Sequence, residues 1–191
     1  MKRLILTAAA FIALTAFTFT EKIWTNDPAH SQLVFTVTHM GISDVSGTFN
    51  DFHATIRTVK TDLSDASIKL TAKVASIDTR VEQRDLHLKS ADFLDAEKFP
   101  EITFESTGLK PAGKNRYKLR GNLTLHGLTR PVTLDLLYIG TAQNPVNKKQ
   151  SAGYKVTGTI SRKAFKIGEQ FPAPLLSDAI TINADGEFQA N

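Results

Sequence analysis

A period-two alternation of apolar and polar residues recurs along most of the chain and constrains its fold more than any other feature. In residues 68–74, isoleucine, leucine, alanine and valine alternate with lysine and threonine, which predicts a strand with one buried and one solvated face. Turn residues separate further segments of this kind, and no alternation with long helices interrupts them. The other predicted strands cover residues 33–39, 45–57, 102–104, 117–126, 132–138, 154–160 and 180–188.

About eight strands without a βαβ rhythm predict an all-β antiparallel barrel or sandwich. Several strands run to about ten residues or more, roughly 33 Å at ~3.3 Å per residue, which favours an eight-stranded barrel with tilted strands. Residues 45–57 have two competing faces, and the pattern does not decide which one points inward. Small residues on apolar faces either leave room inside the barrel or mark corners and bulges. These residues are Ala72, Gly121, Gly158 and Ala184.

Residues 76–104 form the one long segment that alternates poorly, and they are predicted to contain a short helix around residues 79–91. Thr79 followed by Glu82 has the spacing of a capping box, in which each side chain accepts a hydrogen bond from a free backbone N–H. Helical spacing places both apolar and charged residues on the face that would contact the barrel. That face consists of Val81, Arg84, Asp85 and Leu88.

The first 20 residues are predicted to be a secretory signal peptide, and residues 21–191 a single domain. Lys2 and Arg3 precede the uncharged apolar run 4–17, which is too short for the ~20 residues that span a bilayer. The cleavage position stays open. An exported protein of this kind is expected in the periplasm or in the medium. Because it has no cysteine, its stability must rest on its core and sheet.

The charges argue against nucleic acid as a partner. Without Lys2 and Arg3, 21 of the 23 basic residues remain against 19 acidic ones, and no long basic run occurs. Arg162, Lys163 and Lys166 are interpreted as a solvated loop. The five histidines lie nine or more residues apart, and neither a serine nucleophile elbow nor a glycine-rich phosphate loop is present. The sequence therefore predicts no metal site, no catalytic residue and no cofactor.

Several longer motifs together resemble the YceI-like family of exported, lipocalin-like bacterial proteins that bind polyisoprenoid lipids. The similarity covers nearly the whole chain after the leader. One departure occurs where the family usually has R-x-x-F-G, because Lys166 replaces the glycine. The motifs are WTNDPAHS at 24–31, FTVTHMGIS at 35–43, SGTF at 46–49, SIDT at 76–79, RDLHLKSADFLD at 84–95, KFPEITFES at 98–106 and GNLTLHGLTRPV at 121–132.

The resemblance implies an antiparallel barrel whose apolar pore holds an isoprenoid chain, with the polar head near one end, and it does not imply an enzyme. From the alternation alone, the inward apolar residues would be ordinary core. With the resemblance, they become candidates for lining the pore. These candidates are Phe35, Val37, Phe49, Ile68, Leu70, Phe104, Leu123, Leu125, Leu134 and Ile182.

Polar residues inside the family-like motifs are the candidates for binding the head group. Arg84 suits a diphosphate because its planar guanidinium can donate two hydrogen bonds to one group, and a histidine could donate to an anion or a quinone carbonyl. Alternatively, Arg84 forms an ion pair with Asp85 or Asp95 that fastens the helix to the barrel. The head-group candidates are Asp27, His30, His39, Arg84, Asp85 and His87.

The expected function is therefore to bind and carry or sequester an amphiphilic lipid, a polyisoprenoid or an isoprenoid quinone, with transient membrane contact. Two alternatives stay open: an envelope interaction module whose pore is filled by side chains, and an enzyme acting on an isoprenoid or quinone. The sequence fixes neither the ligand nor the open end of the barrel. It also leaves the oligomeric state open, a homodimer included.

Overall fold

A computed structural model describes residues 20–191 and contains ten strands, one α-helix and two short 3₁₀ helices. The predicted leader, residues 1–20, lies almost entirely outside the described residues. The strands are β1 (Lys22–His39), β2 (Ser43–Phe49), β3 (Phe52–Thr58), β4 (Ser67–Lys73), β5 (Ile77–Asp78), β6 (Glu101–Pro111), β7 (Arg116–Leu125), β8 (Leu128–Gln143), β9 (Gln150–Ser161) and β10 (Leu176–Ala190). The helices are η1 (Val74–Ser76), α1 (Glu82–Lys89) and η2 (Lys163–Phe165).

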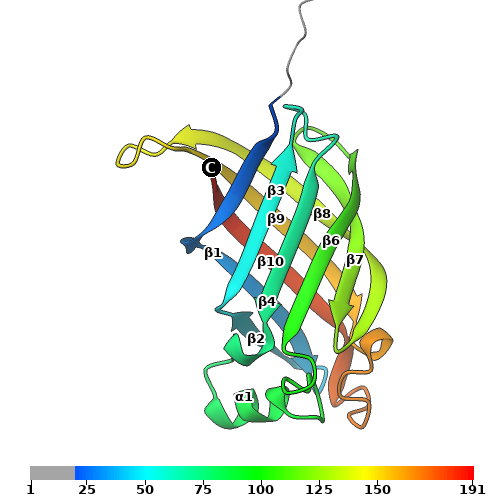
Figure 1. The fold of residues 1–191 in the computed structure, drawn as a ribbon. Coiled ribbons are helices and arrows are strands. Elements are labelled where there is room, and N and C mark those ends of the chain that lie inside the picture. Colours follow the sequence, from blue (N-terminus) through cyan, green and yellow to red (C-terminus); the bar gives the residue numbers. More distant parts are fainter. Residues whose placement is uncertain (1–19) are drawn as a thin grey trace, which may run out of the picture.

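Eight of these strands close into an antiparallel barrel, which confirms the predicted fold (Figure 1). Hydrogen-bonded neighbours follow the order β10-β9-β8-β7-β6-β4-β3-β1, and the pairing of β1 with β10 closes the circle. β7 and β8 form a hairpin with His126 and Gly127 as its turn. Both have positive φ, the conformation that the favoured two-residue hairpin turns require.

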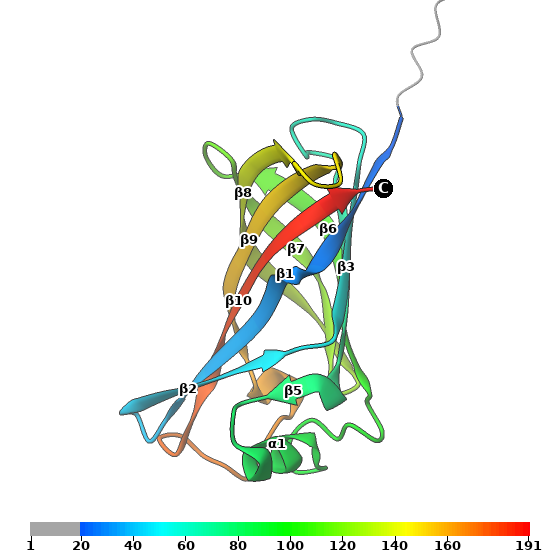
Figure 2. The ribbon, with the colours of Figure 1, turned by 90° about the vertical axis from the view of Figure 1, so that its left-hand side faces the viewer.

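The two ends of the barrel differ because β1 has two partners on the same side. Its first residues, Lys22–Thr25, pair with β3, whereas Val34–His39 pair with β2. At the end of the barrel that Val34–His39 reach, β2 and β5 therefore extend the sheet beside β1, and α1 lies next to β5 (Figure 2). We call this end, where α1 lies, the helix end, and the opposite end, where Thr20 and Asn191 lie, the terminal end.

Residues 45–57, predicted as a single strand, form two strands separated by a turn at Asn50 and Asp51. In β2, the buried residues are Gly47 and Phe49, whereas β3 buries Ala54 and Ile56. The inward face thus changes from odd to even positions across the turn. This change explains why neither face of the segment could be chosen from its alternation.

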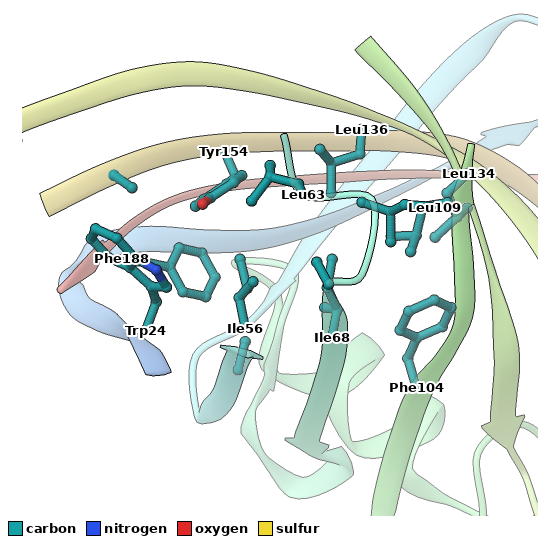
Figure 3. Packing of buried hydrophobic residues seen from close by; sticks show 14 residues of the cluster. Trp24, Ile56, Leu63, Ile68, Phe104, Leu109, Leu134, Leu136, Tyr154 and Phe188 are labelled. Atoms are coloured by element: carbon teal, nitrogen blue, oxygen red, sulfur yellow. The ribbon is translucent and has the colours of Figure 1, made fainter. Parts of the chain in front are cut away.

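Side chains fill the terminal end of the barrel. Trp24, Leu63, Tyr154 and Phe188 belong to one buried cluster there (Figure 3), and the Tyr154 and Phe188 rings meet edge to face with centroids 5.4 Å apart. Burial raises the pKa of the Tyr154 hydroxyl above its ordinary value, with the neighbouring Tyr138 and Tyr117 adding to this effect. A second cluster, which includes Phe165, lies toward the helix end.

Two of the small residues on the inward faces accommodate large neighbours rather than leaving free space. A Cβ atom on Gly121 would lie 2.3 Å from the Phe104 ring, and one on Gly158 would lie 2.4 Å from Leu134 Cδ2. Ala72 is fully buried, and only Ala184 of the four borders the cavity described below. The glycines therefore let Phe104 and Leu134 lie close against the neighbouring backbone.

Replacing Gly121 with alanine is expected to lower the free energy of unfolding by about 1–3 kcal/mol, because the added methyl group must displace Phe104. Urea denaturation followed by circular dichroism measures this change. Gly108→Ala on the paired strand is the control, since nothing lies within 4 Å of its added Cβ, and its effect should stay below about 0.5 kcal/mol. Equal losses in the two variants would contradict the close approach of Phe104.

None of the helices within residues 20–191 has the length and apolar character that crossing a membrane requires.

Candidate functional site

The barrel encloses a cavity of about 520 Å³, within the roughly 300–1,000 Å³ typical of ligand pockets. Its walls are overwhelmingly aliphatic and aromatic, and side chains from both the barrel strands and the helix-end segments contribute. All ten residues predicted to line a pore border this cavity: Phe35, Val37, Phe49, Ile68, Leu70, Phe104, Leu123, Leu125, Leu134 and Ile182. Their part in binding a ligand stays a prediction.

The cavity opens at the helix end. The residues that close the terminal end, among them Trp24, Leu136 and Phe188, do not border it. Conversely, the bordering residues that reach the surface are His39 at the end of β1, His87 on α1 and Leu175 before β10. The pocket is therefore closed at the end where Leu119 and Leu134 lie and accessible from solvent beside α1.

The polar side chains that border the cavity gather at the helix end. They are His39, Thr79, Arg84, His87 and Arg162. Among the described residues that line the cavity there is no aspartate or glutamate. Arginine donates hydrogen bonds only, and threonine and histidine can also donate. This open end therefore suits a polar group that accepts hydrogen bonds better than one that donates them.

The helix predicted around residues 79–91 is confirmed as α1, but the predicted capping box is wrong. Val81 is the N-cap residue and makes no side-chain capping bond. The Thr79 hydroxyl instead donates to Asp85 Oδ1 (2.5 Å), and the backbone N–H of Thr79 donates to the same oxygen (2.8 Å). Asp85 therefore holds the segment before the helix. Val81 is exposed rather than packed on the barrel, unlike Leu88.

Arg84 and Asp85 are connected through Thr79 and not by the direct ion pair that the sequence offered as the alternative to head-group binding. Arg84 Nε donates to Thr79 Oγ1, and Arg84 Nη2 donates to the Thr79 carbonyl, both at 2.7 Å. No salt bridge to Asp85 or Asp95 forms within the described residues. These bonds fix the guanidinium at the cavity wall. The third nitrogen, Nη1, forms no hydrogen bond with any described residue. Asp85 itself does not border the cavity.

His87 stands at the opening between α1 and the segment before β10. Its ring meets Phe93 and Phe171 edge to face, with centroids 5.0 and 5.8 Å away, while the two phenyl rings stack at 4.9 Å. His87 Nε2 also donates to Asp92 Oδ2 at 3.0 Å. The three rings therefore join α1 to the loop between β9 and β10 at the edge of the cavity.

Arg162 is the important residue whose role the sequence did not reveal. The sequence predicts a solvated loop here, but only 1% of the surface of Arg162 is exposed. Its guanidinium donates to the carbonyls of Ile167 (2.9 Å), Gly168 (2.6 Å), Phe171, Leu176 (3.1 Å) and Ser177 (3.0 Å). All five donors are thus used, and one buried arginine organises the loop from 167 to 177 that borders the opening.

Lys166, which stands where the motif R-x-x-F-G has its glycine, adopts the backbone conformation that a glycine favours. Its φ of 57° lies in the left-handed region, which glycine adopts at little cost. It follows η2 directly, and its N–H donates to the Lys163 carbonyl. The lysine therefore makes the same kind of tight turn that a glycine favours, with its side chain exposed to solvent.

Asp27 and His30 lie away from the cavity, on the irregular part of β1 that faces β10. His30 Nδ1 and Asp27 Oδ2 are 2.9 Å apart, and Gln189 Nε2 donates to the same carboxylate oxygen (3.1 Å). The structure therefore brings His39, Arg84 and His87 together at the opening and leaves Asp27, His30 and Asp85 outside it.

The hydrogen bond with Asp27, followed by its negative charge, raises the pKa of His30 above the ordinary histidine value. Asp27→Asn is expected to lower the pKa of His30, so that the ring loses its proton at a lower pH than in the unchanged protein. An NMR titration of the ring protons measures this shift, with exposed His53 as the internal control. An unchanged His30 titration in the variant would contradict the pairing.

No cluster of three or more histidine, cysteine, aspartate or glutamate side chains that could hold a metal ion occurs within residues 20–191.

A closed antiparallel barrel with an apolar internal cavity is a lipocalin-like architecture. The chain belongs to the YceI-like family, because the model of the YceI-like domain matches residues 24–188. A UPF0312 protein of Staphylococcus aureus is 37% identical over 181 residues, covering 93% of this chain and 96% of the relative. The protein YceI of Salmonella agona is 36% identical and covers 81% and 86% of the two chains.

Solved structures support the same assignment. The Campylobacter jejuni YCEI protein has a TM-score of 0.72 at 31% identity, covering 80% of this chain and 88% of that one. BcnA of Burkholderia cenocepacia has a TM-score of 0.75 at 26% identity, covering 85% and 98%. A polyisoprenoid binding domain from Saccharophagus degradans has a TM-score of 0.67, with 88% and 98% covered, and at 12% identity it supports the fold alone.

Proposed function

We propose that this protein binds one amphiphilic isoprenoid lipid, with the apolar chain in the barrel cavity and the polar head at the helix end. The observation that carries this proposal is the composition of the cavity wall, which is apolar except at its open end. The role is to carry or sequester the lipid in the periplasm or outside the cell. The Saccharophagus degradans domain, described as polyisoprenoid binding, is consistent with this function, but the cavity of this chain carries the argument.

The apolar wall supports binding of the chain. Removing apolar surface from water contributes about 25 cal/mol per Å², so a branched hydrocarbon can bind without any directional contact. Leu70, Leu123 and Ile182 point into the barrel yet are only half-buried, because they border the cavity. An isoprenoid chain would cover these surfaces.

The donors at the opening support recognition of a head group that accepts hydrogen bonds. Arg84 is held by Thr79 through Nε and Nη2, which leaves Nη1 available for a phosphate, carboxylate or carbonyl oxygen. His39, at the end of β1, could add a further donor from another side of the opening. The cavity therefore suits isoprenoid phosphates and quinones, and the described residues that line it offer no carboxylate to a cationic head.

Binding without catalysis is part of the proposal. Among the described residues that border the cavity, the histidines are the only candidate general bases, and His87 already engages Asp92 and two aromatic rings. We expect isoprenoid phosphates and quinones to be recovered unchanged after incubation with the protein. Product formation that disappears in His87→Ala would instead favour an enzyme.

Equilibrium binding of geranylgeranyl diphosphate and geranylgeraniol tests the head-group assignment, because the two ligands share a chain and differ in the head. Arg84→Gln should weaken diphosphate binding about tenfold and alcohol binding far less, since it removes a charge-assisted donor. Arg80→Gln is the control, because Arg80 is an exposed neighbour that does not border the cavity. Equal losses for both ligands in Arg84→Gln would contradict the assignment.

A further inference from the structure

The helix end carries a group of exposed apolar side chains around the cavity opening. The β1–β2 hairpin ends in Met40, Gly41 and Ile42, and Ile42 is 83% exposed. Leu175, from the loop before β10, is also exposed and borders the cavity. Figure 2 shows the hairpin and this loop side by side at the end where α1 lies. Val81 and Leu86, in and beside α1, are exposed at the same end.

The hairpin and the loop form one connected element. The N–H of Met40 donates to the carbonyl of Leu175 (3.0 Å), and the N–H of Ile42 donates to the carbonyl of His39 (3.2 Å). Arg162 holds the residues on either side of Leu175 through the Phe171 and Leu176 carbonyls. The exposed apolar tips are therefore presented by a hydrogen-bonded frame.

The fold alone does not account for these residues at the hairpin tip. Met40 has a φ of 53° and Gly41 a φ of 72°. Asparagine, aspartate and glycine are favoured in such turns, whereas a bulky apolar residue with positive φ is locally unfavourable. Neither Met40 nor Ile42 belongs to the buried clusters. Their apolar surface thus faces solvent without contributing to the core.

We propose that the side chains of Met40, Ile42 and Leu175, which we call the apolar rim, insert into the surface of a phospholipid bilayer. The rim is continuous with the apolar cavity wall, because Leu175 belongs to both and Val37 lies just before the hairpin. A hydrocarbon chain could then move from the bilayer into the cavity along apolar surface. A few separate tips are small beside the ~800 Å² per partner that a stable protein interface buries, which favours a bilayer over a second copy of this chain.

Flotation of the full protein with phosphatidylcholine vesicles tests the proposal. The unchanged protein should float with the vesicles, and Met40→Asn with Ile42→Ser should lower its partition coefficient about tenfold or more, since buried apolar side chains drive insertion. Val146→Ser is the matched control, because Val146 is 88% exposed on the β8–β9 hairpin at the terminal end. Its partitioning should stay unchanged.

Three results would overturn the proposal. The protein without substitutions could fail to float with the vesicles, or the rim and Val146 variants could lose vesicle partitioning equally. The rim could also form an interface between two copies of this chain. Sedimentation velocity distinguishes the last, since the rim variant would then convert a dimer to a monomer. The docking role is also separable from lipid binding in the cavity. Leu123→Arg, which places a charge in the cavity, should lose isoprenoid binding and still float with vesicles.

Discussion

Replacing Arg162 with methionine is expected to lower the free energy of unfolding by about 3–5 kcal/mol. The methionine would leave five carbonyl groups between Ile167 and Ser177 without their donor in a buried site. Urea denaturation measures the loss. Because the loop borders the cavity, the variant should also release a bound isoprenoid faster.

Two further variants separate the geometry of Arg162 from its charge. Arg162→Lys keeps the charge but has three donors on a single nitrogen, so it should recover only part of the stability. Arg130→Met is the surface control, because exposed Arg130 donates to the Ala164 carbonyl at 3.3 Å, and its loss should stay near 0.5 kcal/mol or less. Similar losses in Arg162→Met and Arg130→Met would contradict the organising role of Arg162.

Replacing Leu123 with arginine is expected to reduce isoprenoid binding by on the order of 100-fold or more. Leu123 lies on β7 and points into the cavity, where an added guanidinium would face an apolar chain without a carboxylate partner. Isothermal titration with geranylgeranyl diphosphate measures the loss. Leu123→Trp, which fills space without adding charge, should also weaken binding, because it occupies volume that the chain requires.

Asn122→Arg provides the matched control for this experiment. Asn122 is the neighbouring residue on β7 and is exposed on the outer face of the barrel. The same new charge placed there should leave affinity within about twofold. Circular dichroism verifies that each variant is folded. Full affinity in a folded Leu123→Arg protein would mean that the ligand does not occupy this cavity.

Alternation predicted the barrel because strands with one buried face must repeat apolar residues at every second position. The same rule placed residues such as Leu70, Leu123 and Ile182 on the inner face, where the structure has them. It could not decide the faces of 45–57, because a two-residue turn shifts the parity within that segment. Periodicity is a local signal and carries no information across an unrecognised turn.

The hydrogen bonds of Arg162 and Thr79 could not be predicted, for a different reason. Their partners are backbone carbonyls and side chains in irregular segments, and no periodic pattern marks such bonds. The spacing of Thr79 and Glu82 matched a capping box, but Asp85 accepts the threonine hydroxyl instead and the helix begins three residues later. The local sequence permits either hydrogen bond of Thr79, and the tertiary structure determines which of them forms.

The head-group candidates share a suitable chemistry and a place in family-like motifs. These two properties do not distinguish residues at the cavity opening from residues elsewhere on the barrel. His39, Arg84 and His87 reach the opening, whereas Asp27 and His30 pair with each other on the irregular part of β1. A motif can serve the fold as well as a ligand. Only closure of the barrel, through pairing of β1 with β10, determines which polar residues share an end.

Native mass spectrometry of the protein purified without detergent from cells that produce it tests the central claim most directly. We predict a mass in excess of the polypeptide by one lipid, which organic extraction identifies as an isoprenoid. The excess should be absent in Leu123→Arg and present in Asn122→Arg. A polypeptide-only mass that also fails to change when geranylgeranyl diphosphate or an isoprenoid quinone is added would contradict the proposal.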